Sequence, residues 1–242
     1  MSSPLAIITG GSRGIGYAAA EALGRLGWRI VVVGRTAQSA DAASTRLREQ
    51  GIDAFGYGCD VSHPDEVAGL ARFVDALGNV DALINSAGVM SDRTAKTLRT
   101  SHAEWQRVLE TNLNGVFNTI SALGPGMAER RSGRIINVSA CLGRMTGPGT
   151  AGGLAPYRIS KAAVNALTKN LAAELSFGKR GVFVDAMCPN HTRTDMGGPE
   201  APRSPEEAAD TIVWLATRPT VSESGEVAPT GLLWEDREVV PW

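Results

Sequence analysis

Apolar residues gather along the chain in short runs that alternate with longer amphipathic stretches. Runs such as Ile30-Val31-Val32-Val33 are apolar at every position, which is typical of strands covered on both faces. The expected strands lie near residues 5–9, 29–33, 54–58, 81–85, 134–138, 182–187 and 231–234. Their alternation with helices predicts a Rossmann-like α/β fold, a doubly wound parallel sheet of about seven strands with helices on both faces.

No linker, internal repeat or low-complexity run divides the 242 residues, so we expect one domain over residues 1–242. Stretches rich in Gly and Pro occur at 143–156 and 197–205. In a doubly wound sheet these stretches fall in loops at the carboxyl ends of strands, which form the rim of the active site.

A glycine-rich loop follows the first strand, in the order Thr9-Gly10-Gly11-Ser12-Arg13-Gly14-Ile15-Gly16, and a helix follows the loop. Glycines let the backbone approach a pyrophosphate closely, and the N–H groups at the start of the helix attract the anion. An ordinary strand-to-helix turn is the alternative. The position between the first strand and the first helix favours a dinucleotide site.

The second strand ends in Gly34-Arg35-Thr36, where an NAD-binding protein carries an acid for the adenosine ribose. Gly34 removes the carboxylate that would repel a 2′-phosphate, and Arg35 and Arg13 can bind that phosphate through their guanidinium groups. The cofactor prediction is therefore NADP(H), the alternative being that either arginine points into solvent.

Tyr157 and Lys161 lie four residues apart and share one face of a predicted helix. A neighbouring cation lowers the free energy of the phenolate, so the pair predicts a tyrosine that donates and recovers a proton. The alternative is that both residues only line the helix.

Taken together, these motifs resemble the short-chain dehydrogenase/reductase family from Leu5 to the C-terminus. Thr9-Gly10-x-x-x-Gly14-x-Gly16 matches its cofactor loop, Asp60-Val61 its adenine-side pair, and Asn85-Ser86-Ala87-Gly88 its Asn-Asn-Ala-Gly motif. Four residues match its catalytic tetrad: Asn112, Ser139, Tyr157 and Lys161. The runs 193–204 and 236–242 resemble the carbonyl-reductase-like branch.

The resemblance implies a role for each member of the tetrad. Ser139 would hydrogen-bond the substrate carbonyl, and Tyr157 would protonate its oxygen. Lys161 would hold the nicotinamide ribose, and Asn112 would position a water that links Lys161 to solvent. Implied cofactor contacts are Gly10, Ser12, Arg13, Gly14, Ile15, Gly16, Arg35, Thr36, Asp60, Val61, Asn85, Ala87, Gly88, Tyr157, Lys161, Pro189, Thr192 and Thr194.

Three departures from the family pattern concern the substrate. The 17 residues between Ser139 and Tyr157 exceed the usual spacing, and we expect this Gly/Pro-rich segment to border the pocket. Asn190 stands where the glycine of a Pro-Gly turn belongs, and Asn is the non-glycine residue that best tolerates positive φ. Only ten residues separate Thr194 from the next helix, which predicts an open pocket with a short lid.

Five residues follow strand ends or catalytic positions and are the pocket candidates: Met90, Cys141, Met145, Asn190 and His191. Core or loop packing is an equal alternative for the Met and Cys residues. We hypothesise that His191 hydrogen-bonds a polar substrate group at the pocket mouth, the alternative being an exposed loop histidine.

Charge and composition exclude several other classes of protein. The 24 basic and 25 acidic residues are balanced and scattered, which disfavours a nucleic-acid-binding α/β protein and a polybasic membrane patch. No apolar run reaches the length of a membrane span, and the start lacks the pattern of a secretory signal, so a cytoplasmic location is expected. The three Cys and three His residues show no disulfide or metal spacing, so we expect no metal.

The leading prediction is an NADPH-dependent oxidoreductase that reduces a ketone, aldehyde or quinone carbonyl of a small or medium organic molecule to an alcohol, in secondary metabolism. Alternatives on the same site are an NADP-dependent alcohol dehydrogenase or a biosynthetic enzyme whose redox step rearranges its product. A non-catalytic NADP(H)-binding regulator is the alternative from another class. Because relatives commonly pair through the helices after the fourth and fifth strands, a homodimer or homotetramer is expected.

Overall fold

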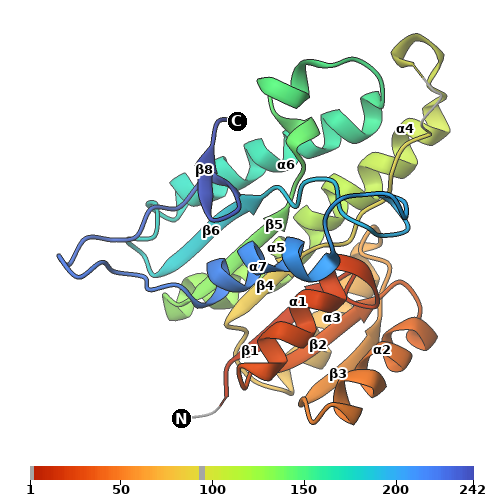
Figure 1. Ribbon diagram of the computed structural model, residues 1–242. Helices are drawn as coiled ribbons and strands as arrows, with labels where there is room; N and C mark the ends of the chain where they lie inside the picture. Colours follow the sequence, from red (N-terminus) through yellow and green to blue (C-terminus); the bar gives the residue numbers. More distant parts are fainter. Residues whose placement is uncertain (1–2, 93–95) are drawn as a thin grey trace.

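A twisted sheet runs through the whole protein (Figure 1). The computed structural model describes residues 3–92 and 96–242, and within them the sheet has eight strands in the order β3-β2-β1-β4-β5-β6-β7-β8. The strands are β1 (Leu5–Thr9), β2 (Arg29–Gly34), β3 (Ala54–Gly58), β4 (Ala82–Asn85), β5 (Gly133–Val138), β6 (Val182–Met187), β7 (Leu233–Glu235) and β8 (Glu238–Val240). All neighbours pair in parallel except β7 and β8.

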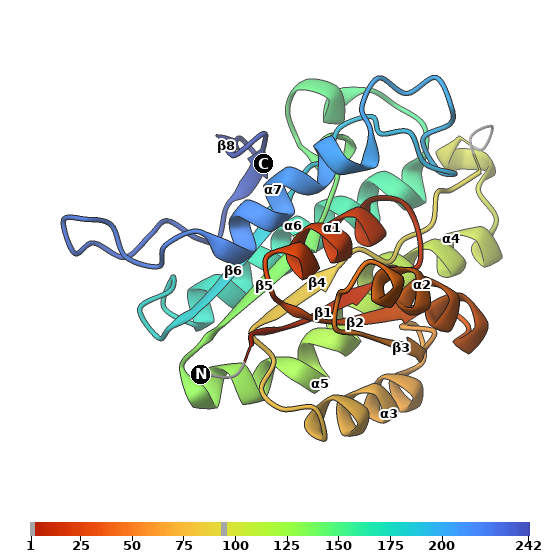
Figure 2. The same ribbon diagram turned by 60° about the horizontal axis from the view of Figure 1, so that its bottom comes forward.

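Helices cover both faces of the sheet (Figure 2). One face carries α1 (Gly14–Arg25), α2 (Ala37–Glu49) and α7 (Pro205–Thr217). The other carries α3 (Pro64–Asp75), α5 (Gly115–Arg130) and α6 (Ala155–Glu174), with α4 (His102–Leu109) preceding α5. The doubly wound α/β fold predicted from the sequence is confirmed. None of the helices among the described residues is long and apolar enough to span a bilayer.

The two cores explain why strands such as β1 and β2 are apolar along most of their length. Ile8 of β1 packs with Leu23 of α1 in one core, whereas its neighbour Ile7 packs with Leu70 of α3 in the other. Successive side chains of a strand point to opposite faces, so a strand covered on both sides has no polar side.

The short strand β8 extends the predicted set of about seven strands. It turns back on β7 through Asp236 and Arg237, whose φ angles of 53° and 65° are both left-handed. A two-residue hairpin needs this geometry, and Asn-Gly is the pair that usually signals it. Because Asp-Arg carries no such signal, the sequence did not predict the hairpin.

The strand order reverses between β1 and β4, and the loops that leave these strands are joined there. The Thr9 hydroxyl at the end of β1 accepts hydrogen bonds at 3.1 Å from the backbone N–H groups of Ser86 and Ala87. A doubly wound sheet binds its ligand in the crevice at such a reversal, outside the carboxyl ends of the strands.

Candidate active site

The glycine-rich loop leaves β1 and delivers the start of α1 to this crevice. Gly14, the first residue of α1, has a φ of 57°, which disfavours a side chain there. A Cβ on Gly16 would lie 2.6 Å from the Gly10 carbonyl oxygen, so the turn closes only with glycine. The N-cap residue Arg13 makes no side-chain cap, and the first turn of α1 holds no acid. This cradle fits a phosphate group of a dinucleotide.

Arginines gather around this loop. Arg13 forms an ion pair with Asp195, and Arg35 is exposed at the end of β2, where Thr36 caps α2. Arg46 of α2 donates to the Ser12 carbonyl at 3.1 Å and lies over the Tyr17 ring. Sequence reasoning missed Arg46 because no motif or spacing ties α2 to the glycine loop.

Asp60 and Val61 follow β3. Burial raises the pKa of Asp60, but the hydroxyl and backbone hydrogen bonds from Ser62 and the charges of His63 and Arg35 outweigh it and lower the pKa. The carboxylate therefore stays ionised. Val61 is buried, and its carbonyl accepts a hydrogen bond from Asn118.

The residues at the end of β4 and after it differ in their surroundings, since Asn85 lies in the core and Gly88 lies beside the predicted tetrad. Asn85 is buried, and its amide bonds Asn137 at 2.9 Å and Thr119 at 2.7 Å, so this side chain joins β4 to β5 and α5. A Cβ on Gly88 would lie 3.4 Å from Asn112 Oδ1 and 3.7 Å from Lys161 Nζ. Gly88 therefore lies directly beside two members of the predicted tetrad.

Asn112 lies in a π-helical turn (Glu110–Asn114) between α4 and α5, and such turns recur at functional sites. It is fully buried, and its Oδ1 accepts from the Val89 N–H at 2.7 Å. Its Nδ2 donates to the Val89 carbonyl at 3.0 Å and to the Ser160 hydroxyl at 3.1 Å. Both amide hydrogens are thus used, and Oδ1 retains one lone pair for a water.

Tyr157 and Lys161 lie one turn apart on the buried face of α6, as predicted. Lys161 Nζ lies 5.8 Å from the centroid of the Tyr157 ring and donates to the Val138 carbonyl at 2.7 Å. Burial lowers the pKa of Lys161 to about 8. The pKa of Tyr157 is raised, first by burial and then by the charges of Cys188 and Cys141. From the sequence we expect Lys161 to lower the pKa of Tyr157. In the structure burial raises that pKa, so the phenol is protonated.

Ser139 directly follows β5 and lies beside this pair. Its hydroxyl is buried and donates to Asn165 Oδ1 at 2.5 Å, with the Lys161 carbonyl at 3.3 Å. Asn165 was missed by sequence reasoning, although it lies four residues after Lys161 on the same helix face. The Ser139 hydroxyl must therefore break its hydrogen bond to Asn165 before it can donate to any other group.

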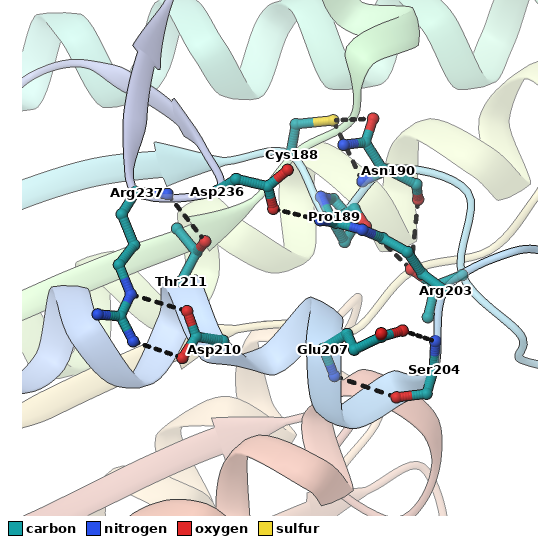
Figure 3. Close-up of polar contacts among 11 residues, drawn as sticks. Cys188, Pro189, Asn190, Arg203, Ser204, Glu207, Asp210, Thr211, Asp236 and Arg237 are labelled. Carbon is teal, nitrogen blue, oxygen red and sulfur yellow. Dashed lines mark hydrogen bonds and ion pairs between the residues drawn. The ribbon is translucent and has the colours of Figure 1, made fainter.

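The turn after β6 keeps its shape despite the missing glycine. Asn190 has a φ of 58°, and its N–H donates to the Cys188 sulfur at 3.4 Å (Figure 3). The expectation that Asn tolerates positive φ here is confirmed. Thr192 bonds the Pro189 carbonyl at 3.0 Å, and a Cβ on Gly14 would lie 3.1 Å from Thr194 Cγ2. The turn therefore brings Thr194 against the glycine loop.

The pocket candidates differ in their surroundings. Met90 and Met196 both pack against a buried cluster that contains Tyr157. Met145 is 74% exposed. His191 is exposed, and its Nε2 lies 2.9 Å from the Gly197 carbonyl. Met196, in the short segment before α7, gave no signal in the sequence.

The β7–β8 hairpin is bonded to the segment between β6 and α7, which carries His191 and Met196 (Figure 3). Arg203 forms an ion pair with Asp236 at the hairpin tip, and its backbone bonds both His191 and Arg193. Arg237 forms a second ion pair, with Asp210 of α7. No cluster of three His, Cys, Asp or Glu side chains among residues 3–92 and 96–242 is arranged to hold a metal.

Comparisons with known proteins agree with this geometry. The family of short chain dehydrogenases matches residues 4–204. The chain is 36% identical to 3-oxoacyl-[acyl-carrier-protein] reductase of Synechocystis sp. over 92% of each sequence. It is 38% identical to the short-chain reductase protein NovJ of Streptomyces niveus, over 88% of this chain and 86% of NovJ.

Two solved structures are similar in fold. A metagenomic short-chain oxidoreductase in complex with NADP has a TM-score of 0.78 and 32% identity, over 97% of this chain and 98% of its own. A variant of actinorhodin polyketide ketoreductase with NADPH has a TM-score of 0.85 and 29% identity, over 96% of this chain and 95% of its own.

Proposed function

Because the chain belongs to the short-chain dehydrogenase family, we propose that it is an NADPH-dependent reductase of a ketone, aldehyde or quinone, with Tyr157 as general acid. The observation that carries this proposal is the buried, protonated Tyr157 beside Lys161, at the crevice where β1 and β4 diverge. In this proposal Tyr157 gives its proton to the carbonyl oxygen, while Ser139 only hydrogen-bonds it and Lys161 keeps its charge.

The crevice fits a phosphorylated dinucleotide. The cradle of Gly10, Gly14 and Gly16 leaves room for a pyrophosphate, and Arg13 and Arg35 supply positive charge where a 2′-phosphate would bind. The solved relatives with NADP and NADPH support the same choice of cofactor. Ser12, Ile15 and Thr36 line the same end of the site.

The remaining contacts are assigned by position. Asp60 and Val61 lie on the adenine side, and the backbone of Asn85, Ala87 and Gly88 leads towards Tyr157 and Lys161, which would bind the nicotinamide ribose. The backbone of Pro189, Thr192 and Thr194 would hold the nicotinamide amide. When bound, the reduced nicotinamide supplies the hydride for the carbonyl carbon.

The chain's own task is to bind the carbonyl and move a proton. The Tyr157 hydroxyl donates its proton to the carbonyl oxygen as negative charge develops there. The Ser139 hydroxyl turns from Asn165 to the same oxygen and stabilises that charge. The Lys161 ammonium, at 5.8 Å from the ring, stabilises the resulting phenolate, and Asn112 Oδ1 positions the water that returns the proton.

The substrate side of Tyr157 is apolar. Met90, Met196 and Leu142 pack against the cluster to which it belongs, which favours the hydrophobic body of a small or medium organic carbonyl compound. The similarity to actinorhodin polyketide ketoreductase supports a place in secondary metabolism. At the pocket mouth, His191 would offer Nδ1 to a polar substrate group, since Nε2 bonds Gly197.

The assembly and location are part of the proposal. Phe117 of α5 is 55% exposed and Ile159 of α6 is 43% exposed, which supports pairing of two chains through these helices. We expect a homodimer or homotetramer in the cytoplasm, in which each chain is a single domain over residues 1–242.

The test is consumption of NADPH and NADH by the purified protein with a panel of ketones, aldehydes and quinones. NADPH turnover that falls by about 10²–10⁴ in Tyr157→Phe supports the proposal. Turnover only in the oxidative direction would favour an alcohol dehydrogenase. NADPH binding without turnover in either direction would contradict the reductase and favour a regulator.

A further inference from the structure

Two of the three cysteines lie together at the active site. Cys141 follows β5 by three residues, and Cys188 directly follows β6. These strands are paired neighbours, with Val138 opposite Met187, so the segments that leave them start side by side. Cys141 packs against the buried cluster that contains Cys188. The backbone brings the two thiols together although 47 positions separate them.

The two thiols are neighbours, because Cys141 packs against the cluster that holds Cys188. Their interaction lowers the pKa of Cys141 and raises that of Cys188. Cys141 is half-buried, whereas Cys188 is 1% exposed. A charge on either sulfur raises the pKa of Tyr157, so the pair lies close to the phenol. Cys141 is therefore the accessible, thiolate-forming partner, and Cys188 is the enclosed one.

Neither thiol has a task in the proposed reduction, which uses a phenol, an ammonium, a hydroxyl and an amide. We propose that Cys141 and Cys188 form a redox modification site, at which a hydroperoxide converts the two thiols to an intramolecular disulfide that stops turnover at Tyr157. The modification depends only on the proximity of the two thiols, and the loss of turnover rests on the proposed function.

The chemistry balances with the hydroperoxide as the only oxidant. The Cys141 thiolate attacks the terminal oxygen, the O–O bond breaks, and the alkoxide leaves as an alcohol after taking a proton, giving a sulfenic acid on Cys141. The Cys188 sulfur then attacks the Cys141 sulfur and loses its proton, and hydroxide leaves as water. Two thiols and one hydroperoxide give one disulfide, one alcohol and one water.

Burial fixes the order of these steps. The enclosed Cys188 does not meet the oxidant, but it belongs to the cluster against which Cys141 packs. Disulfide formation therefore competes well with further oxidation of Cys141, because the resolving thiol is in place.

The disulfide would disturb both sides of the site. The Cys188 sulfur accepts the Asn190 N–H at 3.4 Å, within the left-handed turn that leads to Thr192 (Figure 3). Drawing this sulfur to bonding distance of Cys141 weakens that hydrogen bond. Cys141 lies two residues after Ser139, so the same shift displaces the catalytic hydroxyl. Turnover falls because both the carbonyl site and the nicotinamide side lose their positions.

The experiment treats the purified full-length protein with hydrogen peroxide, blocks the remaining thiols and maps linked peptides by mass spectrometry. We expect a peptide that links Cys141 to Cys188, and NADPH turnover reduced at least about tenfold and restored by dithiothreitol. The matched control is Cys59→Ser. Cys59 is buried elsewhere, and burial raises its pKa to about 12, so this variant should form the disulfide as the wild type does.

Two variants separate the steps. Cys188→Ala should accumulate a sulfenic acid on Cys141 that dimedone traps, whereas the wild type should not. Cys141→Ala should keep its own untreated rate after peroxide, because the remaining Cys188 is enclosed. A linkage absent from the treated wild type, or one that leaves turnover unchanged, would overturn the proposal. The linkage is read by mass, so failure of the reductase proposal would leave that result intact.

Discussion

Arg13 and Asp195 form an ion pair that joins the glycine-rich loop to the segment after β6. The two residues are 182 positions apart in the sequence, and their side chains are 77% and 72% exposed. The arginine that we assign to the 2′-phosphate is therefore already held by a carboxylate. A phosphate that binds Arg13 must displace Asp195 or share the guanidinium with it.

Asp195→Asn should lower KM for NADPH about two- to fivefold and leave KM for NADH unchanged, because an exposed ion pair contributes at most about 1 kcal/mol. Steady-state kinetics with both cofactors measure this effect. Glu21→Gln, which breaks the Glu21–Arg25 pair on α1, is the matched control and should change neither value. An equal change for NADH would show that Asp195 does not act through the 2′-phosphate.

The rate of carbonyl reduction should fall as pH rises through about 8. Burial lowers the pKa of Lys161 to about 8, so its positive charge is complete below that pH and lost above it. Tyr157, whose pKa is raised, stays protonated over the same range. The profile of kcat/KM against pH measures this limb. The residual turnover of Lys161→Arg should show no fall near pH 8, because arginine keeps its charge there. A fall that persists in this variant would assign the titration to another group.

Lys161→Met should stabilise the fold while abolishing turnover. The ammonium is buried and donates to the Val138 carbonyl, and its lowered pKa corresponds to about 1–3 kcal/mol of unfavourable burial. Unfolding in urea at pH 7 measures the gain. The gain should shrink between pH 8 and 10.5, where folded Lys161 loses its proton before the unfolded chain does. Lys169→Met, at an exposed position of α6, is the control and should change stability little.

Asn165→Ala should lower kcat about tenfold with KM for NADPH unchanged. Asn165 Oδ1 accepts the Ser139 hydroxyl hydrogen at 2.5 Å and its Nδ2 donates to the Gly143 carbonyl at 3.3 Å, so its loss leaves the hydroxyl without direction. Asn170→Ala changes an exposed asparagine on the same helix and should have no effect. A rise in KM for NADPH without a change in kcat would contradict this positioning role.

Asn190→Gly should be at least as stable as the wild type, and Asn190→Ala should lose about 1 kcal/mol. The φ of 58° is free for glycine, tolerated by asparagine and unfavourable for alanine. Thermal unfolding of the three proteins gives the order. Equal stability of the Ala and Gly variants would show that the turn relaxes when Asn is removed.

The sequence predicted most of the fold because the central strands contain apolar runs such as Ile30–Val33 that alternate with helical stretches. Motif order likewise located Tyr157, Lys161 and Asn112 on the elements where they are found. Their roles stay predictions. Asn165 could also have been predicted as a site residue, because it continues the four-residue spacing from Tyr157 through Lys161.

Other features depend on contacts that spacing does not encode. The Arg13–Asp195 pair and the meeting of Cys141 with Cys188 arise only when loops from separate strands converge. The raised pKa of Tyr157 is similar, because it depends on how completely the folded chain excludes water from the phenol.

The family match ends at residue 204, yet the ion pair of Arg203 with Asp236 joins the segment between β6 and α7 to the hairpin beyond that limit. Exchange of the chain's last segment between relatives would therefore reshape the approach to Tyr157 without altering any member of the tetrad. Substitutions in the β7–β8 hairpin are therefore a way to change substrate selectivity. For the same reason, a purification tag is better fused to the opposite end.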